Sequence, residues 1–125
     1  MSNDLDTMIR AMDDLGAIIG RDNSSWWTDL ETGEPILRNF GEMLALVHSE
    51  LSEALEAHRK GLMSDKLPNT GGVEEELADA IIRIIDIGVN GGYDVGRALA
   101  EKVIYNRTRK DHTREARLAE GGKKY

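Results

Sequence analysis

Apolar residues recur at steps of three and four along almost the whole chain, which is the period of an α-helix. In the first segment these positions are Leu5, Met8, Ile9, Met12, Leu15 and Ile19. A half-buried strand would need alternation at every second residue, and no convincing run of that kind occurs. The sequence therefore predicts an all-α protein.

Breaker residues divide this periodic pattern into separate helices. Gly61 is a plausible stop for one helix, Pro68–Gly72 interrupts the pattern, and Asp94 is a candidate N-cap after Gly91 and Gly92. The predicted helices cover about residues 4–20, 36–60, 73–89 and 94–110 or beyond. With short connections, this pattern predicts a four-to-five-helix bundle in which the second and third helices lie antiparallel and adjacent.

The second and third predicted helices carry the most apolar surface. The expected buried stripe of the second helix is Phe40, Leu44, Val47, Leu51 and Leu55. The third helix is apolar on most sides, through Ile81, Ile82, Ile84, Ile85 and Ile87. A helix of that kind is normally central in a bundle or an interface, so we expect burial against another subunit.

Length and composition limit the class of protein. The chain has 125 residues, which predicts a single domain over residues 1–120 with a flexible tail at 121–125. Its net charge of −7 argues against binding a nucleic-acid polymer. The acidic start lacks the pattern of a signal peptide, and no apolar run approaches a membrane span. With no cysteine, these features favour a cytoplasmic location without membrane contact.

Two pairs of acids carry the strongest functional signal. Glu50 and Glu53 lie three residues apart in the second helix, and Glu76 and Asp79 are spaced in the same way in the third. Residues three apart share a helix face, so adjacent helices would bring four carboxylates together. Such a cluster repels itself unless it holds a cation, and oxygen ligands suit Mg2+ or Mn2+. The alternative is a solvated acidic surface.

Asp86 extends the acidic face of the third helix by two turns. It lies seven residues after Asp79, between Ile85 and Ile87. A carboxylate in apolar surroundings needs either a partner or a metal ion.

The order and spacing of these acids resemble a known family. Glu-x-x-Glu, a spacer of about twenty residues and Glu-x-x-Asp are typical of the MazG-like all-α nucleoside triphosphate pyrophosphohydrolases. A third similar block follows in the next helix, with Lys102, Asn106, Arg107 and Arg109. The resemblance covers roughly residues 36–112.

The resemblance implies a function for these residues. It implies hydrolysis of a (deoxy)nucleoside triphosphate between the α- and β-phosphates, to the monophosphate and pyrophosphate. Mg2+, with Mn2+ as a substitute, would be held by all four acids, with Glu50 or Glu53 acting on the attacking water. The chain would work as a homodimer or homotetramer that controls a nucleotide pool. The residues expected to bind substrate are Lys102, Asn106 and Arg109 on the phosphates and Trp26 on the base.

Three other interpretations compete with this one. A di-iron carboxylate bundle needs Glu-x-x-His, and no glutamate here has a histidine three residues later. A non-enzymatic helical interaction or regulatory module would use the Ile-rich helix as an interface. A related hydrolase acting on another phosphorylated nucleotide would keep the metal site and change the pocket. The preferred base and sugar stay open.

Overall fold

The computed structural model of the chain describes residues 2–125 and is built from helices. The α-helices are α1 (Ser2–Asn23), α2 (Phe40–Lys60), α3 (Gly72–Gly91), α4 (Val95–Asn106) and α5 (Arg114–Leu118). Short 3-10 helices cover Ser24–Trp27 and Lys110–His112. The only strand-like pairing in the described residues is two isolated bridges, so the all-α class is confirmed.

The chain divides into two compact units. One is Leu15–Tyr93, and the other joins the described residues before Leu15 to Asp94–Tyr125. The single domain and the complete bundle stay predictions. Across residues 2–125, no helix is both long and apolar enough to cross a membrane.

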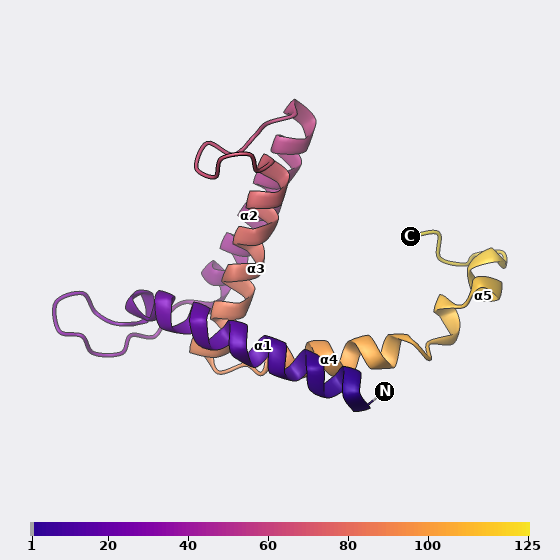
Figure 1. Cartoon of the computed structure of the whole chain (residues 1–125), viewed down its shortest axis with the longest axis horizontal. Helices are drawn as coiled ribbons and strands as arrows, with labels where there is room; N and C mark the ends of the chain where they lie inside the picture. The colour runs from indigo at the N-terminus through magenta and orange to yellow at the C-terminus, as the bar shows by residue number, and fades with distance from the viewer. Residues whose placement is uncertain (1) are drawn as a thin grey trace. The chain divides into compact units, whose positions relative to one another are not determined.

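Helices α2 and α3 pack side by side and antiparallel, as the sequence predicts (Figure 1). Their contact contains many small residues. Ala54 and Ala57 are buried on α2, and Ala80 and Gly88 are buried on α3. Small side chains let two helix backbones approach closely, so acids on the facing sides come within reach of one another.

The predicted buried stripe of α2 is wrong for the chain by itself. Leu44, Leu51 and Leu55 are 43%, 48% and 60% exposed. The face that packs on α3 instead carries Met43, Glu50, Ala54 and Ala57. Both sets recur at helical spacing, and the face with the two alanines allows α2 and α3 to approach more closely. The leucine face is left without cover in the described residues.

The start of α2 differs from the prediction by four residues. Asn39 is its N-cap, and its side-chain oxygen accepts a hydrogen bond from the backbone N–H of Glu42 at 3.0 Å. Before this cap, the Ile36 N–H donates to the Trp27 carbonyl at 2.9 Å, so residue 36 is not helical. The end is as predicted, because Gly61 adopts the left-handed conformation (φ 63°) that closes a helix.

Helix α4 is shorter than predicted. Asp94 caps it as expected, by accepting from the Arg97 N–H at 3.1 Å. The helix ends at Asn106 rather than near Lys110. Just beyond, the Thr108 hydroxyl donates to the Tyr105 carbonyl, and local bonds of this kind compete with helix continuation.

The last part of α1 packs against the end of α3. A Cβ placed on Gly20 would lie 2.6 Å from Val89 Cγ1, so only glycine permits this approach. The Asn90 side chain donates to the Gly20 carbonyl at 3.1 Å. This contact fixes the start of the 3-10 helix Ser24–Trp27, which lies directly after α1 in the chain.

Within the other unit, the start of α1 contacts α4. The Arg107 guanidinium pairs with Asp4 at 2.9 Å. A Cβ on Gly96 would lie 2.9 Å from the Met12 Cβ, so this pair of helices is also closely packed.

Candidate metal centre

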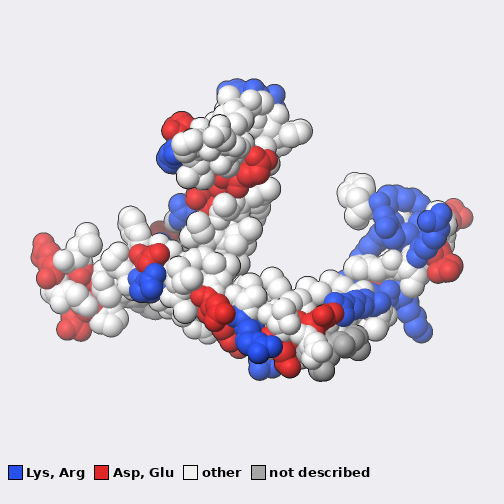
Figure 2. All heavy atoms as spheres, viewed as in Figure 1, with Lys and Arg blue, Asp and Glu red and all other residues white. Residues whose placement is uncertain are grey.

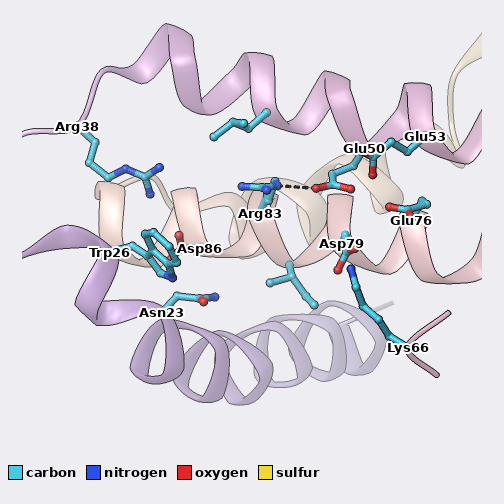
Figure 3. A pocket seen from close by; sticks show the side chains of 12 residues that line it. Asn23, Trp26, Arg38, Glu50, Glu53, Lys66, Glu76, Asp79, Arg83 and Asp86 are labelled. Atoms are coloured by element: carbon cyan, nitrogen blue, oxygen red, sulfur yellow. Dashed lines mark hydrogen bonds and ion pairs between the residues drawn. The ribbon is translucent and has the colours of Figure 1, made fainter. Parts of the chain in front are cut away.

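Carboxylates from α2 and α3 meet between the two helices. Oxygens of Glu50, Glu76 and Asp79 all lie within 4.8 Å of one another. A hard cation binds carboxylate oxygens at about 2.0–2.6 Å, so one ion can reach all three residues. The three side chains point into one cavity (Figure 3).

Glu53 joins this group from one turn further along α2. Its side chain is exposed, lines the same cavity and lies close enough to help raise the pKa of Glu76. The structure therefore brings all four acids of the two predicted pairs together. That they bind a metal ion stays a prediction.

Glu50 has one satisfied and one unsatisfied oxygen. The residue is only 7% exposed, and its Oε1 accepts from Arg83 Nε at 3.0 Å. Its Oε2 is buried and has no hydrogen-bond partner among the described residues. Burial by itself would raise the pKa of Glu50, but the hydrogen bond and charge of Arg83, together with the neighbouring Glu76 carboxyl, outweigh it and lower that pKa. An ionised carboxylate with a free buried oxygen fits a cation ligand.

The other two acids hold their protons more tightly. Burial and the neighbouring carboxylates of Glu50 and Glu53 raise the pKa of Glu76 to about 7. Burial and the charge of Glu50 also raise the pKa of Asp79. At neutral pH Glu76 is therefore protonated in a large fraction of the molecules, and a bound cation would displace that proton.

The cavity beside these acids has a volume of about 600 Å³. Figure 3 shows Glu50, Glu53, Glu76 and Asp79 at one end, with Lys66 beside them. Arg83 lies in the middle. Asn23, Trp26, Arg38 and Asp86 form the opposite end. The predicted substrate residue Trp26 thus lies on the same cavity as the acids, 68% exposed.

Asp86 has protein partners of its own. Trp27 Nε1 lies 3.1 Å from both carboxylate oxygens of Asp86, and Asn90 donates to Oδ1 at 2.7 Å. Of the two possibilities expected for Asp86, a protein partner or a metal ion, the structure shows protein partners.

Sequence reasoning missed the two arginines of this cavity. Arg83 lies four residues after Asp79, so the helical period already placed it on the acidic face. Arg38 precedes α2 in irregular chain, where no periodic signal exists. Its guanidinium carbon lies 5.1 Å from the centre of the Trp27 ring.

The predicted phosphate-binding residues belong to the other unit. Lys102 Nζ lies 4.7 Å from the centre of the Tyr105 ring. Asn106 Oδ1 is buried and lacks a hydrogen-bond partner in residues 2–125. Arg109 is bound to Asp111 through Nε at 3.0 Å and Nη2 at 2.6 Å. Their role on phosphate stays a prediction.

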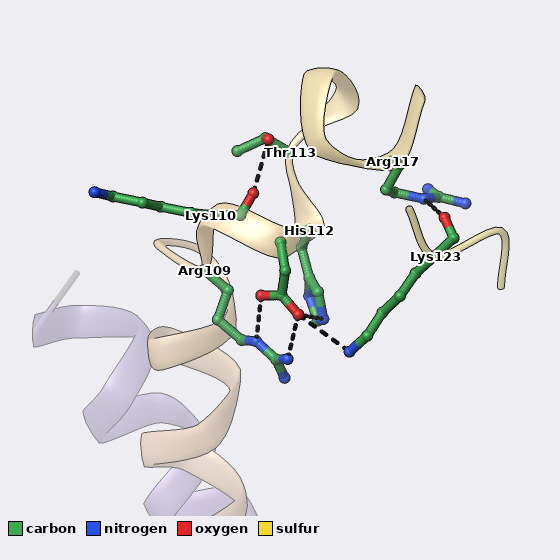
Figure 4. Close-up of polar contacts among 7 residues, drawn as sticks. Arg109, Lys110, His112, Thr113, Arg117 and Lys123 are labelled. Carbon is green, nitrogen blue, oxygen red and sulfur yellow. Dashed lines mark hydrogen bonds and ion pairs between the residues drawn. The ribbon is translucent and has the colours of Figure 1, made fainter. Parts of the chain in front are cut away.

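Basic side chains gather along the C-terminal segment (Figure 2). Lys123 lies 3.1 Å from the Asp111 carboxylate, which also accepts from Arg109 (Figure 4). These two contacts lower the pKa of Asp111. Arg117 donates to the carbonyls of Lys123 and Lys124, so the predicted flexible tail makes contacts in the structure. Its flexibility stays a prediction.

No protein-family model matches the chain, and no curated protein or solved structure matches it. The function of the chain is therefore inferred from the geometry of its described residues.

Proposed function

We propose that the chain is a Mg2+-dependent nucleoside triphosphate pyrophosphohydrolase of the MazG-like type. The observation that supports this best is the group of Glu50, Glu76 and Asp79, whose oxygens lie within 4.8 Å of one another beside a cavity of about 600 Å³. A triphosphate is strongly negative, so an acidic site binds it only through cations. Cavities of this volume are typical of small-molecule sites.

The donor set suits a hard divalent cation. All the candidate ligand atoms are carboxylate oxygens, which favour Mg2+ or Mn2+ over softer metals. Glu50 Oε2 is buried without a hydrogen-bond partner among the described residues, and such an acceptor is costly unless a cation or water satisfies it. When bound, the metal ion would polarise phosphate oxygens and lower the pKa of water.

The residues of the chain have separate tasks in this proposal. Glu50, Glu76 and Asp79 would hold the cation. Arg83 keeps Glu50 ionised and oriented through its 3.0 Å hydrogen bond. Glu53 is exposed on the cavity, so we assign it the role of accepting a proton from the attacking water.

Substrate contacts and self-association complete the proposal. Trp26 would stack on the base, and Lys102, Asn106 and Arg109 would contact phosphates. The exposed leucines of α2, together with exposed Leu77, Ile81 and Ile84 on α3, support self-association into a homodimer or homotetramer.

Product analysis with purified protein tests the reaction. The chain is incubated with each common NTP and dNTP, with and without Mg2+, and products are separated by chromatography. Monophosphate plus pyrophosphate, formed only with the metal, is the expected result. Diphosphate plus phosphate would contradict the proposed bond, and absence of turnover would favour an interaction module.

A matched pair of variants ties the activity to the cluster. Glu53→Gln should abolish most of the turnover. Glu56→Gln is the control, because Glu56 lies on the same helix and pairs with Lys60 at 2.6 Å outside the cluster. Equal activity of the two variants would contradict the assignment.

A further inference from the structure

We propose that the end of the cavity opposite the carboxylates holds the nucleobase, and that Arg38 selects guanine there. Trp26, Arg38 and Asn23 form this end (Figure 3). The inference rests on the proposed function, because it takes a nucleotide as the ligand. It goes further by naming the base and the residue that discriminates it.

Trp26 supplies a free aromatic face. The side chain lines the cavity and is 68% exposed, so the protein leaves most of its ring uncovered. The next residue, Trp27, already has a role within the protein, because its indole N–H donates to Asp86 at 3.1 Å. Stacking on an aromatic ring is tolerant of base identity. Trp26 therefore binds a base without choosing which one.

Arg38 supplies donors that the protein does not use. Its guanidinium is held over the Trp27 ring at 5.1 Å, and within residues 2–125 it makes no hydrogen bond or ion pair. Arg83 differs, because its Nε already donates to Glu50 at 3.0 Å. A planar guanidinium presents its N–H groups as a fork that recognises two adjacent acceptors. Arg38 is therefore placed to read one edge of a ligand.

The carboxylate of Asp86 at this end already has protein partners. Asp86 Oδ1 accepts from both Trp27 and Asn90, and Oδ2 accepts from Trp27. A ligand can still use the guanidinium of Arg38, which only donates, the amide of Asn23, which donates and accepts, and the remaining lone pairs of Asp86. The edge of a base that faces Arg38 must therefore accept hydrogen bonds.

Guanine presents such an edge. Its O6 and N7 are adjacent acceptors that match an arginine fork, whereas adenine places an amino group beside N7. The adenine amino group would place a hydrogen-bond donor opposite the donors of Arg38. The volume of about 600 Å³ accommodates a purine nucleotide whose phosphates extend past Arg83 towards the carboxylates.

Equilibrium binding of four monophosphates tests the inference. Isothermal titration calorimetry measures dGMP, dAMP, dCMP and dTMP on the full chain in the presence of Mg2+. We expect dGMP to bind at least about 10-fold more tightly than dAMP, because bidentate contacts to a base usually discriminate by about that factor or more. Equal affinity for the four, preference for another base, or no binding of any would overturn the assignment.

Two arginine variants show whether Arg38 is responsible. Arg38→Lys keeps the charge and loses the fork. It should remove the preference for dGMP while leaving the affinity for dAMP unchanged. Arg59→Lys, an exposed arginine of α2 outside this cavity, should keep the preference. If Arg38→Lys keeps the preference, or weakens all four nucleotides equally, Arg38 does not read the base.

A third variant separates holding the base from choosing it. Trp26→Ala should weaken all four nucleotides by about 10-fold and leave their order intact, because stacking is tolerant of sequence. Unchanged affinity in this variant would remove the stacking face from the proposal. Since binding needs no turnover, a guanine preference without hydrolysis would keep the base site and refute the proposed reaction. Hydrolysis without any base preference would do the reverse.

Discussion

Asp79 and Asp86 lie seven residues apart on α3, yet their surroundings are opposite in kind. Asp86 is only 8% exposed and accepts hydrogen bonds from Trp27 and Asn90. Asp79 faces other acids, with oxygens of Glu50 and Glu76 within 4.8 Å. One carboxylate is satisfied by neutral donors, and the other belongs to a group of like charges.

This difference shows which acids point to a metal ion. Burial of a carboxylate is insufficient, because at Asp86 two N–H donors already compensate for lost hydration. The cluster around Asp79 has too few donors, since Arg83 reaches only one oxygen of Glu50 and the other is buried without a partner in the described residues. Several carboxylates close together, one of them with an unpaired buried oxygen, indicate a metal site more strongly than burial alone does.

The largest expected effect is on activity. Asp79→Asn should lower Mg2+-dependent hydrolysis by at least about 100-fold, because even the partners of metal ligands commonly contribute 10–100-fold. Steady-state kinetics by pyrophosphate release measure this loss, and circular dichroism checks the fold. Glu56→Gln should keep full activity. A folded Asp79→Asn protein with normal kcat/KM would show that the cluster is a solvated acidic surface.

The second prediction concerns metal binding without turnover. Mg2+ at about 100 times its Kd should raise the free energy of unfolding by about 2.7 kcal/mol, because it binds only the folded chain. Urea titrations with Mg2+ or with EDTA measure the difference. Asp79→Asn should lose the gain, whereas Asp86→Asn should keep it. A gain that is equal in all three proteins would place the ion elsewhere.

The third prediction concerns Asp86, whose carboxylate already accepts hydrogen bonds from the protein. Asp86→Asn replaces a carboxylate oxygen, which accepts hydrogen bonds, with an amide NH2 group, which donates them. Trp27 and Asn90 therefore lose part of their hydrogen bonding. The free energy of unfolding should fall by about 1–3 kcal/mol, the usual range for a buried polar group left unpaired. Urea unfolding in EDTA measures it. Asp13→Asn, at an exposed position of α1, is the control. A loss no larger than that of the control would mean that these contacts stabilise nothing.

The sequence predicted the acidic cluster because its geometry is local. A spacing of three fixes two carboxylates on one helix face, and the short connection after Gly61 makes α2 and α3 neighbours. The partners of Asp86 could not be predicted in that way. Trp27 lies 59 residues away in the chain, and its position depends on how α1 ends against α3.

The orientation of α2 shows a second limit of the sequence. Leu44, Leu51 and Leu55 recur at helical spacing, and so do Met43, Ala54 and Ala57. Periodicity identifies a helix with two apolar faces but cannot say which face meets α3. In the structure the alanine face of α2 meets α3, because small side chains permit a shorter distance between the helices.

The smallest expected effect is a pH dependence of the metal-free protein. The pKa of Glu76 is raised from the ordinary 4.5 to about 7 by burial and by Glu50 and Glu53. Between those values the folded chain holds a proton that the unfolded chain has released. The free energy of unfolding should therefore fall as pH rises through this window and level off above it. The lowered pKa of Glu50 acts below the window.

A neutral replacement of Glu76 isolates this contribution. Glu76→Gln cannot ionise, so its free energy of unfolding in EDTA should depend less on pH between about 5 and 7. At a pH of about 8 it should exceed that of the unmodified chain, because the repulsion with Glu50 and Glu53 is gone. Urea titrations across this pH range measure both, with Glu56→Gln as the control that keeps the slope. The opposite signs of Glu76→Gln and Asp86→Asn separate a crowded acid from a satisfied one. If both variants lose stability at the higher pH, the carboxylates around Glu76 do not repel one another, and the cluster needs no cation to hold it together.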